Sequence, residues 1–262
     1  MSAGTHAGLR GPVDLHGKVV LVTGATGGLG SAICHAFAEA GALVVAGYNR
    51  SGEAAVALTR DLPAPGQGGH VAVALPVTDS DALRRGAALV AEAFGRVDVL
   101  VNCAGTTRYV PHDDLDALDD ALIDTVLATN VRGPIAMARA FRSLLEAGEA
   151  PVIVNISSVA ARTAIGSNIA YCASKAALDN LTASLARALA PRIRVVSVSP
   201  GLVDTDFVRA MDPAWRAMQA RLTPLGRLAD PAEVATAVLL AAGAMPFTTG
   251  VAIPVDGGRP LY

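Results

Sequence analysis

A glycine-rich turn between a short strand and a helix constrains this chain more than any other feature. Residues 19–22 read Val-Val-Leu-Val, a β-branched run that indicates a buried strand. Residues 23–30 follow at once and contain four glycines, and residues 31–40 then repeat apolar side chains at helical spacing. Such a turn lets the backbone approach a pyrophosphate at a helix N-terminus. We therefore favour dinucleotide binding here over a purely structural turn.

Strands and helices alternate along the rest of the chain. Apolar runs predict strands at 43–47, 70–75, 97–101, 152–156, 195–198 and 251–255. Helical periodicity predicts helices at 79–94, 115–129, 131–146, 168–190 and 231–243. This alternation is typical of a parallel sheet covered on both faces. We expect a single α/β domain at 18–262, a doubly wound Rossmann-type sheet of about seven strands, preceded by a flexible N-terminal arm at 1–17.

Composition narrows the class of protein. Of the 262 residues, 52% are hydrophobic and 17% are charged, so a sizeable core is available. The net charge is −2 without a basic block, which argues against nucleic acid or an anionic membrane surface as a partner. Cys34, Cys103 and Cys172 lie far apart, which favours a reduced, cytoplasmic protein without a metal site. The longest charge-free apolar run, 234–245, is too short to span a bilayer.

Tyr171 and Lys175 lie four residues apart in a predicted helix, so they share one face. Most Tyr-x-x-x-Lys pairs are surface neighbours, but this chain has nineteen arginines and only two lysines, Lys18 and Lys175. Lysine is a compact, tunable point charge. Its ammonium is expected to lower the pKa of the phenol from about 10 and so make Tyr171 a general acid/base. Ser158, after a predicted strand, could hold a carbonyl oxygen beside the phenol.

The end of the second predicted strand indicates which dinucleotide binds. An NAD site usually has an acid there for the ribose 2′-OH. This chain has Asn49-Arg50-Ser51 instead, and a guanidinium suits a 2′-phosphate. We therefore expect NADPH, the alternative being that Arg50 is merely solvated at a helix start. Farther along, Asn130 interrupts an apolar-periodic segment and is either a satisfied kink or a functional donor.

From about Leu15 to the C-terminus the chain resembles the short-chain dehydrogenase/reductase family. Four separated motifs carry the resemblance: the glycine turn, Asn102-Cys103-Ala104-Gly105, the set Ser158, Tyr171 and Lys175, and Pro200-Gly201 with Thr205. Asn130 falls where the family has a fourth catalytic residue. Two departures stand out: Cys103 replaces an Asn, and Pro76 replaces the usual Asp that binds adenine, so the adenine must be held by backbone or by Val77.

The resemblance implies a role for each catalytic residue. Tyr171 would protonate the carbonyl oxygen, Ser158 would hold that oxygen, and Lys175 would bind the nicotinamide ribose and lower the phenol pKa. Asn130 would hold a water that relays protons to Lys175. The residues expected to contact the cofactor are Gly24, Thr26, Gly28, Leu29, Gly30, Asn49, Arg50, Ser51, Val77, Asn102, Ala104, Gly105, Tyr171, Lys175, Pro200, Gly201, Val203 and Thr205.

Residues 202–228 are expected to form a substrate lid. Phe207, Met211, Trp215 and Met218 are candidate pocket-wall residues, or they pack the lid on the core. A mostly apolar pocket predicts a small-molecule ketone that is hydrophobic or aromatic, a specialised metabolite in biosynthesis.

The closest subgroup in sequence character comprises 3-oxoacyl carrier-protein reductase-like and polyketide-type ketoreductases. Residues 143–150 contain Glu146 and Glu149 and no basic residue, which disfavours docking of an acidic carrier. The basic residues Arg192 and Arg194 leave a carrier-bound substrate as an open alternative. Two further alternatives are an NAD-dependent alcohol dehydrogenase and a non-catalytic dinucleotide sensor. The family also implies a homotetramer formed through the Tyr171 helix and the C-terminal strand.

Overall fold

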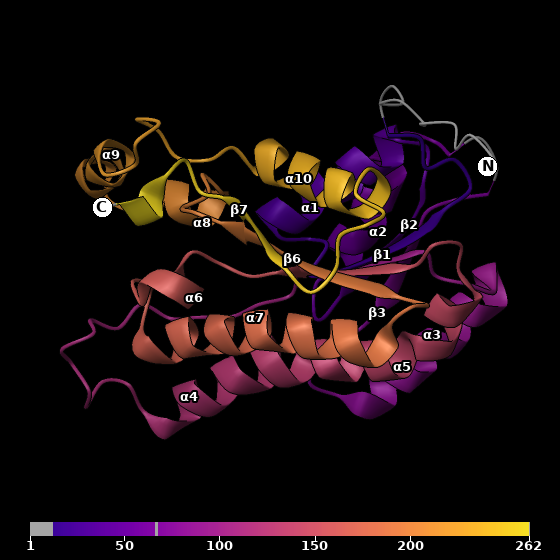
Figure 1. The fold of residues 1–262 in the computed structure, drawn as a ribbon, viewed down its shortest axis with the longest axis horizontal. Helices are drawn as coiled ribbons and strands as arrows, with labels where there is room; N and C mark the ends of the chain where they lie inside the picture. The colour runs from indigo at the N-terminus through magenta and orange to yellow at the C-terminus, as the bar shows by residue number, and fades with distance from the viewer. Residues whose placement is uncertain (1–12, 66–67, 262) are drawn as a thin grey trace, which may run out of the picture.

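A parallel sheet forms the middle layer of the protein in the computed structural model, which describes residues 13–65 and 68–261 (Figure 1). Its seven strands are β1 (Val19–Thr23), β2 (Leu43–Tyr48), β3 (Val71–Ala74), β4 (Val99–Asn102), β5 (Val152–Ile156), β6 (Arg194–Pro200) and β7 (Ala252–Val255). They lie in the order β3-β2-β1-β4-β5-β6-β7, and all neighbours are parallel. The chain changes direction across the sheet between β1 and β4, where open α/β sheets bind ligands. The predicted single-domain, doubly wound fold is confirmed.

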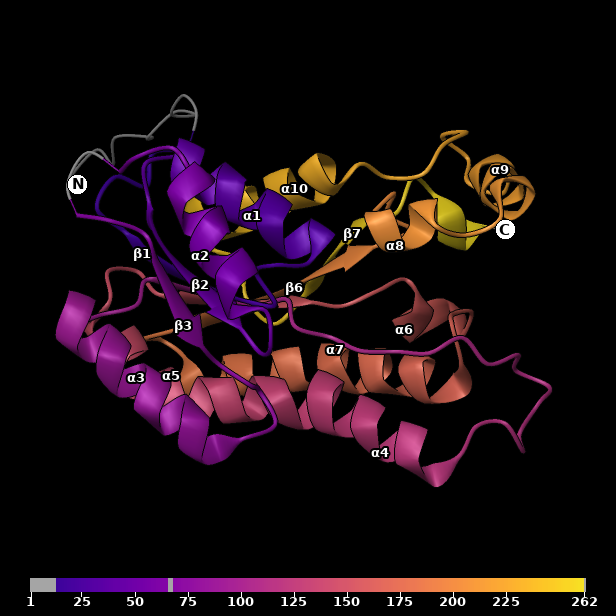
Figure 2. The same cartoon turned by 180° about the vertical axis from the view of Figure 1, so that it is seen from behind.

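Helices cover both faces of the sheet (Figures 1 and 2). One face carries α1 (Gly28–Glu39), α2 (Gly52–Asp61) and α10 (Pro231–Gly243). The other carries α3 (Ser80–Phe94), α4 (Asp120–Leu127), α5 (Gly133–Ala147) and α7 (Ile169–Leu189). The remaining elements are the π-turn η1 (Ala128–Arg132), α6 (Ala160–Thr163), α8 (Asp206–Arg209), α9 (Pro213–Arg221) and the 3-10 turn η2 (Arg259–Leu261).

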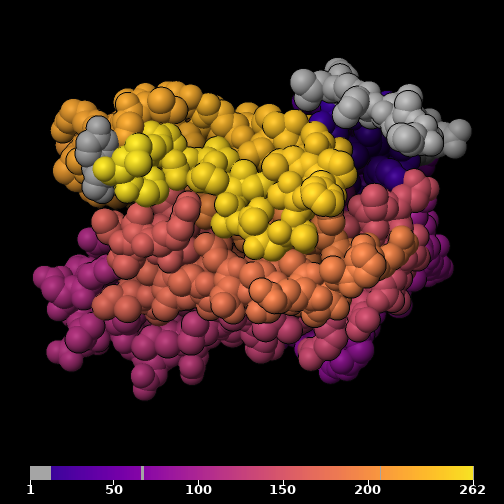
Figure 3. Space-filling view, viewed as in Figure 1, coloured from indigo at the N-terminus to yellow at the C-terminus, as the bar shows by residue number. Residues whose placement is uncertain are grey.

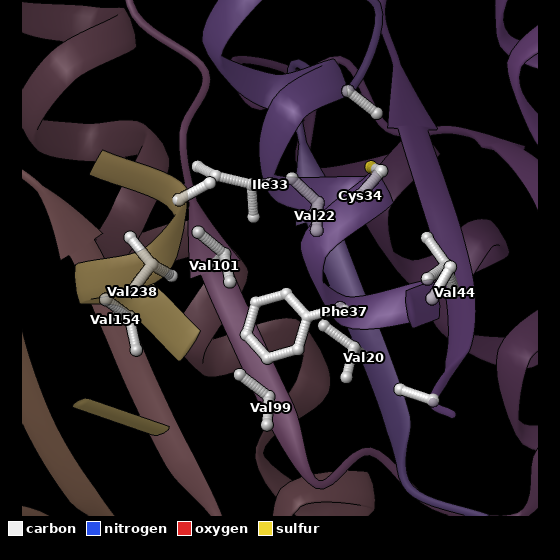
Figure 4. Close-up of a cluster of buried hydrophobic side chains, with 14 of the residues drawn as sticks. Val20, Val22, Ile33, Cys34, Phe37, Val44, Val99, Val101, Val154 and Val238 are labelled. Carbon is white, nitrogen blue, oxygen red and sulfur yellow. The ribbon is translucent and has the colours of Figure 1, made fainter. Parts of the chain in front are cut away.

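The strand side chains alternate between two hydrophobic cores. In β1, Val20 and Val22 face α1 and α10, whereas Leu21 faces the α3 and α5 side, because successive side chains of a strand point to opposite faces. Figure 4 shows the first of these cores, with the ring of Phe37 from α1 lying among valines of the sheet. The strands are apolar on both faces for this reason, and their sequences read as continuous apolar runs.

Replacing Phe37 with leucine is expected to destabilise the fold by about 1–2 kcal/mol, because the smaller side chain leaves part of the space of a fully buried ring unfilled. Urea unfolding monitored by circular dichroism measures this as a lower midpoint with an unchanged slope. Leu89→Ala on α3 is the control, since this leucine is 56% exposed. An equal loss in both variants would contradict the packing argument.

Three differences from the sequence-based prediction have a clear physical reason. Of the predicted arm at 1–17, residues 1–12 lie outside the described residues, but Val13 and Leu15 pack on the domain: Leu15 is buried and its N–H donates to the Ala40 carbonyl. The helix predicted from residue 115 begins only at Asp120, because Asp119 caps it by accepting from the Leu122 N–H. Helix α2 is not among the predicted helices, because its sequence is only weakly apolar and Ala55 alone among its residues is buried.

Candidate active site

The glycine turn has a shape that other residues cannot adopt. Gly24 has φ +65°, and a Cβ on it would lie 2.9 Å from Ala104 Cα. A Cβ on Gly30 would lie 2.2 Å from the Gly24 carbonyl oxygen. Thr26 and Gly28 are exposed beside the start of α1, and no side chain caps this helix. The uncapped N–H groups and the open backbone fit a pyrophosphate.

Thr23 joins the glycine turn to the segment that follows β4. Its hydroxyl oxygen accepts from the N–H groups of Cys103 and Ala104, each at 3.1 Å. Asn102, the last residue of β4, is buried, and its Nδ2 donates to Asn155 Oδ1 at 2.8 Å. Gly105 lies so close to the candidate catalytic residues that an added Cβ would be 3.9 Å from Lys175 Nζ. The segments that follow β1 and β4 therefore lie against each other beside Lys175.

The predicted nicotinamide-side residues lie at or just after the end of β6, and one of them reaches the glycine turn. A Cβ on Gly28 would lie 3.3 Å from Thr205 Cβ, so Thr205 stands against the glycine turn. Gly201 packs on the Asp256 backbone, where a Cβ would lie 3.1 Å from the Asp256 Cα. Val203 forms an isolated parallel bridge with Ala229. The two ends of the predicted lid are thereby held together.

The predicted 2′-phosphate residues follow β2, the strand that pairs with β1. Asn49, Arg50 and Ser51 follow β2 and are exposed. Val77 follows β3 and is buried against α5, where a Cβ on Gly133 would lie 2.9 Å from Val77 Cγ2. The Val77 side chain is therefore committed to the core, and its backbone is the part that could face an adenine.

Ser158 lies just beyond β5 and is half-buried. Its hydroxyl oxygen accepts from the Ala160 N–H at 3.2 Å. The neighbouring Ser157 is buried and points inward, with its hydroxyl 3.4 Å from the Lys175 carbonyl oxygen. Of the two serines that β5 delivers, Ser158 is thus the one beside Tyr171, and its hydroxyl acts on the phenol pKa by hydrogen bonding.

Lys175 is 6% exposed and lies in α7 with Tyr171. Its ammonium donates to the Ile156 carbonyl oxygen at 2.7 Å and lies 5.7 Å from the centroid of the Tyr171 ring. Burial lowers the pKa of Lys175 to about 8, while nearby Cys103 and Asp179 oppose this shift. The spacing-based expectation that both residues share one helix face agrees with this geometry.

The pKa of Tyr171 corrects the sequence-based expectation. Lys175 was expected to lower it, but burial raises the pKa of the phenol above its usual value, and the hydrogen bond with Ser158 opposes this only in part. Burial dominates because it withdraws the phenolate from water, an effect that residue spacing does not reveal. Tyr171 therefore carries its proton throughout the neutral pH range.

Asn130 lies in the π-turn η1, between α4 and α5, and is buried. Its Oδ1 accepts from the Thr106 N–H at 2.9 Å, and its Nδ2 donates to the Thr106 carbonyl oxygen at 3.1 Å and to Ser174 Oγ at 3.1 Å. These bonds satisfy the side chain, as the satisfied-kink alternative expects, and the functional role of Asn130 stays a prediction. Its contacts with Thr106 and Ser174 were not predicted, since nothing in the local sequence joins positions so far apart.

The segment 202–228, predicted to be a lid, contains α8 and α9 and lies beside the C-terminal residues, coloured yellow in Figure 3. Met211 and Trp215 are half-buried and Met218 is 40% exposed, while the side chain of Phe207 lies outside the described residues. Two cavities of about 280 and 480 Å³ adjoin this segment. Among the described side chains, Tyr171, Ser158, Met211, Trp215 and Met218 line neither cavity.

The described residues offer neither a membrane-spanning helix nor a cluster of metal-ligating side chains. None of the helices within 13–65 and 68–261 combines the length and apolarity needed to cross a membrane. In the same part of the chain, no group of three or more His, Cys, Asp and Glu side chains is placed to hold a metal ion.

Comparison with known proteins gives consistent matches along nearly the whole chain. A family profile described as enoyl-(acyl carrier protein) reductase matches residues 24–259. The chain is 39% identical to D-threitol dehydrogenase of Mycolicibacterium smegmatis, over 94% of both proteins. It is 34% identical to 3-oxoacyl-acyl-carrier-protein reductase FabG of Vibrio harveyi, over 94% of this chain and 98% of that protein. A putative short-chain dehydrogenase/reductase from Burkholderia xenovorans superposes with a TM-score of 0.85 at 35% identity, covering 94% and 98% of the two chains.

Proposed function

The chain belongs to the short-chain dehydrogenase/reductase family of oxidoreductases, and we propose that it reduces a ketone to a secondary alcohol with NADPH. The observation that carries the proposal is the grouping of a protonated phenol, a serine hydroxyl and a buried ammonium beside the glycine turn. Tyr171, Ser158 and Lys175 supply these three groups. Because all three of these catalytic candidates are present, a non-catalytic dinucleotide sensor is disfavoured.

Bound NADPH would supply the hydride, and the protein supplies position and electrostatics. The Ser158 hydroxyl holds the carbonyl oxygen of the substrate, and the Tyr171 hydroxyl donates its proton to that oxygen as negative charge develops. A raised phenol pKa keeps Tyr171 protonated at neutral pH, the form that reduction requires. The Lys175 ammonium offsets the charge left on the phenolate, and Asn130 keeps the segment after β4 next to both groups.

Replacing Arg50 with alanine is expected to weaken NADPH binding about tenfold or more and to leave NADH binding nearly unchanged. The reason is that a guanidinium bonded to a phosphate contributes about 1.5–3 kcal/mol. Fluorescence titration of both cofactors measures the change. Arg60→Ala is the charge-matched control, since Arg60 is exposed in the last turn of α2, the helix that begins just after Arg50. Equal weakening of both cofactors would contradict a role for Arg50 in reading the 2′-phosphate.

The first test of the function is a parallel titration of NADPH and NADH, followed by turnover assays. We expect NADPH to bind more tightly and acetophenone, as a hydrophobic aromatic probe, to be reduced. Acetoacetyl-coenzyme A tests the carrier-bound alternative. NAD with D-threitol tests the alcohol dehydrogenase alternative, which is favoured by the similarity to D-threitol dehydrogenase. Binding of neither cofactor would refute the proposal.

The proposal includes a lid that closes over the substrate and assembly into a homotetramer. Met211, Trp215, Met218 and Phe207 would contribute to the substrate wall on closure of the segment 202–228. The homotetramer through α7 and β7 stays a prediction. Exposed apolar side chains on or beside these elements support it, namely Ile169 at 41% and Val251 at 45%. Sedimentation velocity measures the assembly state directly.

A further inference from the structure

Asn168 is a fully buried polar residue at the start of α7. Its backbone is extended, and its Oδ1 accepts from the Tyr171 N–H at 2.7 Å, so it caps the helix that carries Tyr171 and Lys175. A cap requires only an oxygen acceptor, which serine, threonine and aspartate also provide. Asparagine adds an Nδ2 donor, and in a buried position that donor must find partners.

The Nδ2 partners lie on the loop between β4 and α4. Asn168 Nδ2 donates to the Arg108 carbonyl oxygen at 2.7 Å and to Thr107 Oγ1 at 3.1 Å. The Thr107 and Ser167 hydroxyl oxygens are 2.5 Å apart, and the Val110 N–H donates to the Ser167 carbonyl at 2.8 Å. The loop therefore runs along the residues that precede α7, and Figure 2 shows it passing α6 and the start of α7 before α4 begins.

A second carboxamide, that of Asn130, holds Thr106, the loop residue just before Thr107. Asn130 forms both of its backbone hydrogen bonds with Thr106, and its Nδ2 also donates to Ser174 Oγ. The Ser174 hydroxyl in turn donates to the Tyr171 carbonyl oxygen at 2.7 Å. Two asparagines thus tie consecutive loop residues, 106 to 108, to the first turns of α7. One of them bonds to the Tyr171 N–H directly, and the other reaches the Tyr171 carbonyl through Ser174.

We propose that Asn168 is a positioning residue for Tyr171, locking the loop at 106–110 and the first turn of α7 into one arrangement. This rests on the proposed function, since it takes Tyr171 to be the proton donor. Asn168 acts through the Tyr171 backbone, so its loss lets the phenol move relative to Ser158. A displacement of about 1 Å at a reacting group can lower a rate by about 10²-fold.

Three variants separate this role from ordinary helix capping. Asn168→Ala removes the cap and the loop contact. Asn168→Asp keeps an oxygen for the Tyr171 N–H but places a second carboxylate oxygen, in place of the donor, against the Arg108 carbonyl. Asp79→Ala removes the cap of α3, where Asp79 accepts from two backbone N–H groups, and it serves as the matched control for the loss of a cap.

The measurements are kcat with acetophenone at saturating NADPH, the NADPH Kd, and amide hydrogen exchange of residues 106–110. We expect kcat to fall at least about tenfold in Asn168→Ala and to stay reduced in Asn168→Asp, with Kd within about threefold of wild type. Exchange of the loop should speed up in both variants. Asp79→Ala should retain kcat within about twofold and leave exchange of the loop unchanged.

Three results would overturn the proposal: a kcat within about twofold of wild type in Asn168→Ala, an equal loss in Asp79→Ala, or full recovery in Asn168→Asp, which would leave only a capping role. If wild type binds NADPH but reduces none of the probes, the proposed function fails by itself. Loop exchange then still decides the role of Asn168: faster exchange in Asn168→Ala supports the coupling, and unchanged exchange overturns it.

Discussion

Tyr171→Phe is expected to lower kcat for ketone reduction by about 10³-fold, within the range of about 10²–10⁴-fold that general acids contribute, while the NADPH Kd stays within about threefold of wild type. The change removes one hydroxyl from a side chain whose ring packs beside Lys175 and leaves the helix intact. The lost group is the proton donor, and phenylalanine has no proton to offer. Steady-state rates and a fluorescence titration of the same preparation measure both quantities.

Tyr109→Phe is the matched control for this variant. Tyr109 lies in the loop held by Asn168 and is 69% exposed, so the same hydroxyl is removed from the neighbourhood of the site without touching the proposed chemistry. We expect its kcat to remain within about twofold of wild type. A near-normal kcat in Tyr171→Phe would refute the catalytic assignment. Loss of NADPH binding in that variant would instead show that the phenol serves the cofactor.

Lys175→Met is expected to abolish most activity and, at neutral pH, to stabilise the fold. In wild type the ammonium is 6% exposed, and burial lowers its pKa from 10.5 to about 8. At 1.36 kcal/mol per pKa unit this difference corresponds to a penalty on the order of 3 kcal/mol for keeping the charge buried. The variant also loses the hydrogen bond to the Ile156 carbonyl, which lowers its stability by about 1 kcal/mol. A net gain of about 2 kcal/mol remains.

The stability gained in Lys175→Met is expected to depend on pH. Because the pKa of Lys175 is lower in the folded than in the unfolded protein, the unfolded chain binds more protons, and wild-type stability rises with pH between about 8 and 10.5. The advantage of the methionine variant is therefore full below pH 8 and disappears by about pH 10.5. Urea unfolding at several pH values measures it. A lower stability of the variant at pH 7 would contradict the argument.

Lys18→Met is the control, since Lys18 is the other lysine of the chain. It pairs with Glu149 near the surface, at an Nζ–Oε2 distance of 2.5 Å, where such pairs contribute about 0–1 kcal/mol. We expect Lys18→Met to keep its activity and to show at most a small loss of stability.

In wild type, the rate of reduction should fall above about pH 8 as the Lys175 ammonium loses its proton.

The sequence by itself determined the features that depend on neighbouring residues. The run at 19–22 and the glycines after it predicted β1, its turn and α1, because periodicity and positive φ are local properties. The four-residue spacing of Tyr171 and Lys175 likewise placed them on one face of α7, because helical periodicity sets that relation. Alternation of strands and helices then fixed the architecture through the rules for parallel sheets.

The tertiary structure alone decided what depends on contacts between distant residues. It showed that Leu15 packs on the domain and that Asp119, not the apolar pattern before it, sets the start of α4. It reversed the expected direction of the Tyr171 pKa, since burial depends on everything packed around the phenol. It also joined Asn168 to residues about sixty positions earlier. Periodicity records which face of an element is apolar, whereas the environment of a buried group is set by chain segments that only folding brings together.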